Sequence, residues 1–168
     1  MEGKTKGVLV AVLAVVGLGW LVSRGKVAPG GLSAGISVAI YDMAGNLVPA
    51  NSPATLVAGF WYTARVTVTN TSTQGGAGVA NTLLTALVVR IAGIEVLNPG
   101  ARSDYYGASQ ALQFDYSFYV DTAYAGTSGT ATASVYSQTF ALLNTAVEVL
   151  DIAAAPIIPS AFVTVGAF

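Results

Sequence analysis

The chain has 168 residues, of which 54% are hydrophobic and only 9% are charged, and its formal net charge is −1. Soluble proteins average about 25% charged residues, so this composition argues against a nucleic-acid binder and favours either a subunit packed among neighbours or a secreted β-domain. Histidine and cysteine are both absent, which removes the usual general base, the thiolate nucleophile, disulfides and the commonest zinc ligands.

We therefore expect no enzyme, no cofactor, no metal and no small-molecule substrate. A serine nucleophile would need lysine as its base, and every lysine belongs to the N-terminal region: Lys4, Lys6 and Lys26. Carboxylates could hold Ca²⁺ only by meeting from separate loops, since the chain has no Asp-x-Asp-x-Asp spacing. We interpret these aspartates as solvated turn residues: Asp42, Asp104, Asp121 and Asp151.

The N-terminal segment has 17 residues without a charge between Lys6 and Arg24. As a helix it would be about 25 Å long, near the lower limit for crossing a bilayer. Basic side chains flank the run and could reach the two interfaces: Lys4, Lys6, Arg24 and Lys26. The segment predicts a membrane anchor over residues 1–26, formed by Val8, Leu9, Leu13, Val16, Leu18, Trp20, Leu21 and Val22.

Three alternatives to a permanent anchor stay open: a cleaved signal peptide, a pilin-type tail and a buried core helix. Against a signal peptide, Arg24 and Lys26 stand where small neutral residues should precede the cut. Lys6-Gly7 resembles the site cut in type IV pilins, but Val12 stands where bacterial pilins carry an acidic residue. Basic residues are nearly balanced across the segment, so orientation rests on composition, which favours an extracytoplasmic domain or a place in a virion.

A short tether, residues 27–35, is expected next, because Pro29, Gly30 and Gly31 break any helix. Residues 36–168 then alternate between apolar and polar, which predicts strands. One strand should direct Tyr62, Ala64, Val66 and Val68 to the core. Residues 36–41 are expected to form a half-buried strand, in which Ile36, Val38 and Ile40 alternate with Ser37, Ala39 and Tyr41. The remaining strands are expected near residues 83–97 with a bulge or break at Gly93, 113–121, 130–136, 140–152 and 157–168.

About eight short strands separated by Gly, Pro and Asn turns predict an all-β sandwich, with a jelly roll as the alternative. The segments Val57-Ala58-Gly59, Tyr62–Val68 and Asn70-Thr71-Ser72, with the later hairpin-like stretch 112–136, resemble immunoglobulin-like modules of bacterial and archaeal surface proteins. That resemblance implies an immunoglobulin-like β-sandwich. The order of anchor, tether and single domain also resembles small structural proteins of phages and archaeal viruses, including those with membranes.

Three further features could carry contacts. Tyr105-Tyr106 follows a turn and is a candidate partner surface, although one ring could instead cap the core. Asn70-Thr71-Ser72 is a glycosylation sequon, but Asn70 is first of all a turn residue. The last strand could be donated to a neighbour's sheet through Phe162, Val163, Val165 and Phe168.

Together these features predict a non-enzymatic structural protein, whose partners are a lipid membrane and copies of itself or other structural subunits. A virion is the assembly that we consider first. The alternatives are a pilin-like or strand-donating filament subunit, and an adhesin or glycan-binding module using Tyr105, Tyr106 and Trp61, although Trp61 itself is expected in the core.

Overall fold

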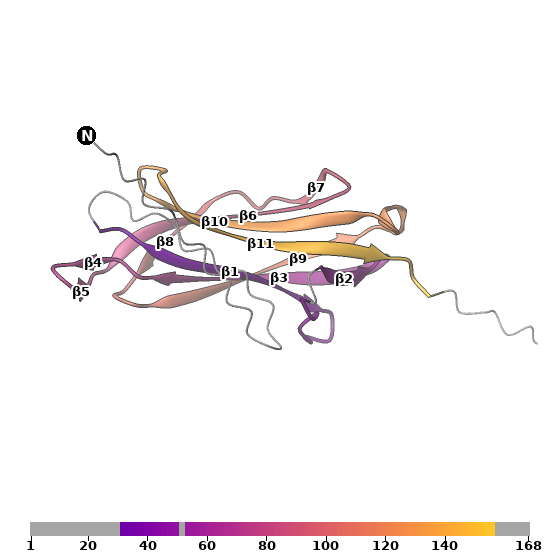
Figure 1. The fold of residues 1–168 in the computed structure, drawn as a ribbon, viewed down its shortest axis with the longest axis horizontal. Coiled ribbons are helices and arrows are strands. Elements are labelled where there is room, and N and C mark those ends of the chain that lie inside the picture. Colours follow the sequence, from indigo (N-terminus) through magenta and orange to yellow (C-terminus); the bar gives the residue numbers. More distant parts are fainter. Residues whose placement is uncertain (1–30, 51–52, 157–168) are drawn as a thin grey trace, which may run out of the picture.

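The computed structural model describes residues 31–50 and 53–156, which form an all-β sandwich of two facing sheets (Figure 1). The predicted anchor over residues 1–26 and the predicted last strand over residues 157–168, which includes the segment 162–168 proposed for donation, lie outside these described residues. Within them, no helix is long and apolar enough to cross a membrane. The strands are β1 (Ala34–Asp42), β2 (Ala54–Val57), β3 (Phe60–Asn70), β4 (Thr73–Gln74), β5 (Ala77–Gly78), β6 (Asn81–Ile91), β7 (Ile94–Leu97), β8 (Arg102–Tyr106), β9 (Ala111–Val120), β10 (Ser128–Ser137) and β11 (Leu142–Ala153).

The first sheet has the order β1-β3-β9, and all of its pairs are antiparallel. The second has the order β2-β11-β10-β6-β7, with β8 also paired to β6. Its β2 runs parallel to β11, whereas its other pairs are antiparallel. A small β4–β5 hairpin projects from one end.

Alternation along the strands builds the core, because successive side chains point to opposite faces of a sheet. On β3 the predicted inward set is confirmed: Tyr62, Ala64, Val66 and Val68 are buried. On β9, Phe114, Phe118 and Val120 are buried, and Tyr116 is partly buried. On β10 the predicted inward residues Ala131, Ala133 and Val135 have no exposed surface.

Two predicted boundaries differ from the structure. The stretch 83–97 is a hairpin of β6 and β7 rather than one strand, with a two-residue turn at Ala92 and Gly93, both of which have positive φ. This confirms the predicted break at Gly93. The first strand begins at Ala34, inside the predicted tether, because Ala34 already pairs with Asn70, the last residue of β3.

The first strand was also expected to be half-buried, and that was wrong. Both Ser37 and Ala39 on its polar face are buried. Ala39 is small and pairs with Arg65, whose guanidinium group lies 4.5 Å from the ring centre of Tyr41, so longer neighbours on the same face cover it.

The sandwich has two distinct ends. The N-proximal end holds residues 31–33 and the connections 71–80, 107–110 and 138–141, and it lies on the left in Figure 1. The distal end holds the connections 43–50, 58–59, 92–93 and 121–127 and lies on the right. Every connection at the N-proximal end is free of charged residues, whereas the distal end carries Asp42 and Asp121.

Residues 31–33 are clamped to the strand connection that begins at Thr71. The backbone of Ser33 exchanges hydrogen bonds with the Ser72 hydroxyl, each 3.0 Å long, and the Thr71 amide also donates to the Ser33 carbonyl. Gly31 is required at its position, because a Cβ there would lie 2.3 Å from the Thr73 carbonyl oxygen and its φ is +77°. The chain therefore enters the domain through a fixed junction.

Candidate functional site

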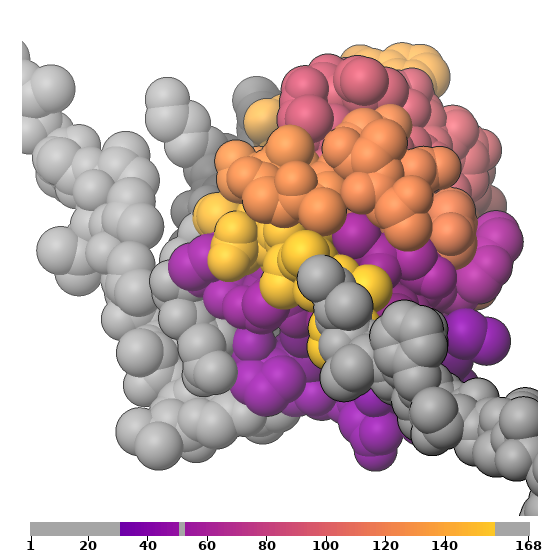
Figure 2. Space-filling model, turned by 90° about the vertical axis from the view of Figure 1, so that its right-hand side faces the viewer, coloured from indigo at the N-terminus to yellow at the C-terminus, as the bar shows by residue number. Residues whose placement is uncertain are grey.

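A hollow of about 310 Å³ opens at the distal end of the first sheet. Asp42 and the turn after β1 form one side, Val57 of β2 and the start of β3 the other, so its lining is mostly apolar: Asp42, Met43, Ala44, Val57, Phe60, Trp61 and Tyr62. Figure 2 views this end, where purple atoms from the early strands meet yellow atoms of the last strand. The hollow brings together elements that are separated along the chain.

The rim of the hollow is unusually rich in exposed aromatic and thioether surface. Phe60 and Trp61 are each 50% exposed, and Met43 is 75% exposed. The Trp61 ring lies 5.5 Å from that of Tyr119 on β9, at a tilt of 48°, which is a favourable aromatic geometry. The prediction that Trp61 belongs to the core was therefore wrong. We call Met43, Phe60, Trp61 and Tyr119 the distal aromatic cluster.

The local backbone explains this exposure. Gly59 has φ +91° and donates its amide to the Val120 carbonyl, so a tight turn starts β3 at the very end of the sheet. Tyr62 then turns inward, and its hydroxyl accepts a hydrogen bond of 2.7 Å from the Val57 amide. Phe60 and Trp61 precede this first buried residue, and no connection covers them completely. Alternation could not reveal this, because exposure at a strand end depends on the neighbouring loops.

Asp42 supplies the negative charge of the hollow, but the turn occupies its carboxylate. Asn46 donates to it through its backbone amide at 2.8 Å and through its side chain at 3.0 Å. These hydrogen bonds, the side-chain one first, lower the pKa of Asp42. A ligand of the hollow would thus be held chiefly by aromatic and apolar contact, with Asp42 as a weak attraction for donors or cations.

The predicted partner surface at Tyr105 and Tyr106 divides between two environments. Successive residues of β8 face opposite ways, so Tyr106 is fully buried whereas Tyr105 is 69% exposed. Burial raises the pKa of the Tyr106 hydroxyl, which stays a neutral phenol. The pair does not form one aromatic surface, and the predicted partner contact now depends on Tyr105 alone.

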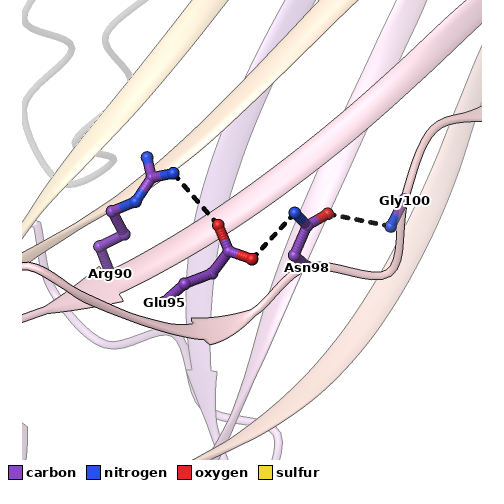
Figure 3. A network of polar contacts seen from close by, with 4 residues as sticks. All are labelled: Arg90, Glu95, Asn98 and Gly100. Carbon is purple, nitrogen blue, oxygen red and sulfur yellow. Dashed lines mark hydrogen bonds and ion pairs between the residues drawn. The ribbon is translucent and has the colours of Figure 1, made fainter.

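All three arginines of the described residues are occupied by carboxylates of the same chain. Arg65 pairs with Asp115 through two bonds of 2.7 Å, and Arg102 pairs with Asp104 at 2.7 Å and 2.8 Å. The third pair is part of the network in Figure 3, where Glu95 accepts from Arg90 and Asn98, and Asn98 accepts from the Gly100 amide. This network holds the predicted Asn98-Pro99-Gly100 turn and leaves Arg90 less available to an anion.

The sequon residue Asn70 has a structural role. Its side chain is fully buried, and its amide nitrogen donates to the carbonyls of Val79 and Gly107 at 2.7 Å and 3.0 Å. Its side-chain oxygen accepts from the Ser72 amide. A glycan must be attached to that buried nitrogen, so the folded domain does not offer Asn70 for modification.

Two observations concern catalytic or metal chemistry. Within residues 31–50 and 53–156, no three Asp or Glu side chains approach closely enough to hold a metal ion. Sequence reasoning missed Glu148, which is only 6% exposed on β11. Burial raises its pKa to about 7. Its position was detectable, because it alternates with the apolar residues Ala146, Leu150 and Ile152.

No family model matches the sequence, and no curated protein matches it. Solved structures that resemble the fold include a Niemann-Pick type C2 protein from Japanese carpenter ant, with 8% identity and a TM-score of 0.43 over 76% of this chain and 94% of that one. The sporulation control protein Spo0M from Bacillus subtilis has 11% identity and a TM-score of 0.43 over 74% of this chain and 51% of its own. The β-glucosidase from Listeria innocua has 10% identity and a TM-score of 0.41 over 73% and 16%. At these scores the similarities carry no functional argument.

Proposed function

We propose that this protein is a non-enzymatic structural subunit, anchored to a membrane by residues 1–26 and joined through its sandwich to other subunits of a repeated assembly. A membrane-containing virion is the assembly that we place first. The β-domain would lie on the extracytoplasmic side or within the particle. Neither nucleic acid nor a small substrate is part of this proposal, and the described arginines, all paired, offer no free cation for a phosphate.

The observation that carries the proposal is the polarity of the domain along its length. The apolar N-terminal segment joins the sandwich at Gly31, where the clamp formed with Thr71 and Ser72 fixes the junction. The distal aromatic cluster lies at the other end, because its residues follow β1, begin β3 and end β9. A rigid junction at one end and exposed aromatic surface at the other suit a subunit that stands on a membrane and meets neighbours farther out.

The distal aromatic cluster has the chemistry of a subunit contact. Aromatic residues and methionine are enriched in the cores of protein interfaces, whereas charged residues are depleted there. Trp61 and Tyr119 present rigid rings at little cost in conformational entropy. A copy of the chain or another structural subunit would cover these rings and fill the hollow that Met43, Phe60 and Trp61 help to line.

We further propose an immunoglobulin-like arrangement for the sandwich. With β1, β3 and β9 taken as strands A, B and E, and β6, β10 and β11 as C, F and G, the two sheets have the orders A-B-E and G-F-C. Strand β7 then extends the second sheet beyond C. This order supports the immunoglobulin-like alternative over a jelly roll.

The free edge of β9 favours one version of the filament alternative, in which a neighbouring subunit donates a strand. Among the described strands, β9 pairs only with β3, so its other edge has no strand partner over residues 111–120. A neighbour's segment containing Phe162, Val163, Val165 and Phe168 is uncharged and could add to such an edge. Deleting residues 162–168 would then abolish polymerisation while the fold is kept.

A glycan-binding role is the remaining alternative, and the half-exposed Trp61 favours it. Sugar rings pack against exposed aromatic faces, and Asp42 lies in the same hollow. Sugar recognition also needs polar groups that are free to hydrogen-bond the hydroxyls, and the Asp42 carboxylate already accepts two hydrogen bonds from Asn46. A glycan array with no hits would remove this alternative.

The test uses an antibody against the domain on material from the native source. Membranes, purified particles and the soluble fraction are compared, and the intact mass is measured. The proposal expects a protein near 17.0 kDa in particles or membranes, released only by detergent and present in many copies. A mass short of the first seven residues would redirect it to a filament. A soluble, monodisperse protein absent from both fractions would overturn it.

A further inference from the structure

The β10–β11 hairpin exposes a phenylalanine at its tip. Three residues, 138–140, connect Ser137 with Ala141, and the Ser137 amide donates to the Ala141 carbonyl at 2.9 Å. Phe140 closes the loop by donating its amide to the Ser137 carbonyl, also at 2.9 Å. Its φ is +60° and its side chain is 72% exposed.

Phenylalanine is an uncommon residue at the last position of such a loop. A three-residue hairpin loop usually ends with a residue in the left-handed region, where glycine is preferred because other side chains are strained there. Phe140 bears that strain, and its exposed ring gains little packing in return within the described residues. Strain held at an exposed position is a reason to look for a contact outside the domain. Leu142, the first residue of β11, is also exposed, at 55%.

The tip lies at the same end as the junction with the N-terminal segment. The Asn144 side chain donates to the Ala34 carbonyl at 2.9 Å, which ties the start of β11 to the start of β1. Four residues lie between Lys26 and Gly31, and the five Cα-to-Cα steps from one to the other can span at most about 18 Å. The N-proximal connections around the tip carry no charge, and Tyr105, 69% exposed, also lies toward this end because it pairs with Thr82.

We infer that Phe140 and Leu142 form a second membrane contact, which inserts into the interfacial layer of the bilayer that the N-terminal segment anchors. This inference rests on the proposed function, since it needs the anchor. Phenylalanine and leucine favour the boundary between headgroups and acyl chains, and an uncharged rim lets the domain approach it without desolvating ions. With two contacts the sandwich would have a fixed tilt.

The chain has no cysteine, so one introduced cysteine carries one label. The full chain is placed in vesicles of phosphatidylcholine with phosphatidylglycerol and labelled with an environment-sensitive fluorophore. Three positions are compared: Thr139→Cys at the tip, Met43→Cys at the distal end, and Ala14→Cys in the apolar run. We expect quenching by a lipid with a shallow spin label to be at least twofold stronger at 139 than at 43.

Removing the ring gives the decisive comparison. Phe140→Gly in the Thr139→Cys chain should reduce the quenching at 139 to the level at 43, while the thermal midpoint stays equal or rises because strain is relieved. Ala92→Gly is the matched control: it changes another exposed hairpin residue with positive φ, at the distal end, and should leave the signal at 139 unchanged.

The outcomes test the N-terminal anchor and the second contact at Phe140 separately. If the label at 14 is quenched by lipid but 139 behaves like 43, the second contact is refuted and the anchor stands. If the label at 14 is not quenched, the anchor fails and the inference fails with it. If 139 becomes shielded only on self-association without lipid, a neighbouring subunit is the partner and the lipid assignment is overturned.

Discussion

Glu148 predicts an unusual pH dependence of stability. It lies on the core-facing side of β11, 6% exposed, and has no hydrogen-bond or ion-pair partner among the described residues. Burial raises its pKa from the ordinary value of 4.5 to about 7. Ionising this carboxyl therefore costs about 3 kcal/mol more in the folded state than in the unfolded state.

The sign follows from proton linkage. The folded state keeps the proton more tightly than the unfolded state does, so the free energy of unfolding falls as pH rises from about 4.5 to about 7. Hydrogen bonds lower the pKa values of Asp42 and Asp115, so these groups act in the opposite direction and at more acidic pH. The window between pH 5 and pH 8 therefore reports mainly on Glu148.

Urea unfolding of the full chain in a non-ionic detergent, at pH 5, 6, 7 and 8, measures the effect. Glu148→Gln should flatten the profile and be more stable than the parent by about 3 kcal/mol at pH 8, because a neutral amide replaces a buried charge. Asp151→Asn removes the same charge from the exposed side of the same strand and is the matched control. Equal profiles for the two variants, or a parent whose stability rises from pH 5 to pH 8, would refute the reasoning.

Three further predictions concern the turns, the buried polar cluster and the distal end. Ala92→Asn should stabilise the domain by about 0.5–1 kcal/mol in a denaturant melt, since Ala92 has φ +52° in a two-residue hairpin turn where asparagine is preferred; a loss of stability would contradict the turn assignment. Asn70→Ala should destabilise it by roughly 2–3 kcal/mol, because the Val79 and Gly107 carbonyls lose their donor; a change below about 0.5 kcal/mol would show that water replaces the amide. Trp61→Ala should leave the melting temperature within a few degrees but weaken subunit association at least tenfold by sedimentation, whereas Tyr105→Ala at the opposite end should not; equal association of both variants would exclude the distal contact.

The regular parts of the fold were predictable because a two-residue period needs only local sequence. The inward faces of β3 and β10 followed directly from alternation. The β6–β7 hairpin was only half predictable: Gly93 marked the break, but Ala92 is an uncommon residue for the left-handed position that makes a two-residue turn. The strand pairing between sheets depends on long-range contacts that no short pattern encodes.

The candidate site was less predictable, for a physical reason. Phe60 and Trp61 continue an apolar sequence and differ from core residues only in lying beyond the loops that would cover them. Glu148 is a charged residue that lies in the core rather than an apolar residue that lies at the surface. Its alternation with Ala146 and Leu150 indicates burial, whereas its charge favours exposure to solvent. Exposure at strand ends follows from the arrangement of loops, whereas burial in mid-strand follows from the period.

The distribution of charge connects the two ends of the molecule. The described residues contain three arginines and seven carboxylates, a net charge of −4, while the whole chain has −1, so the first thirty residues carry +3. Three aspartates lie toward the distal end, opposite the junction: Asp42 ends β1, Asp121 follows β9, and Asp151 pairs with Ser128 at the start of β10. An anionic lipid surface would attract the N-terminal flanks and repel the distal end. The distribution of charge and the uncharged tip at Phe140 therefore both favour an orientation with the N-proximal end toward the membrane. Raising the salt concentration should weaken the electrostatic attraction and leave the apolar contact of the tip intact.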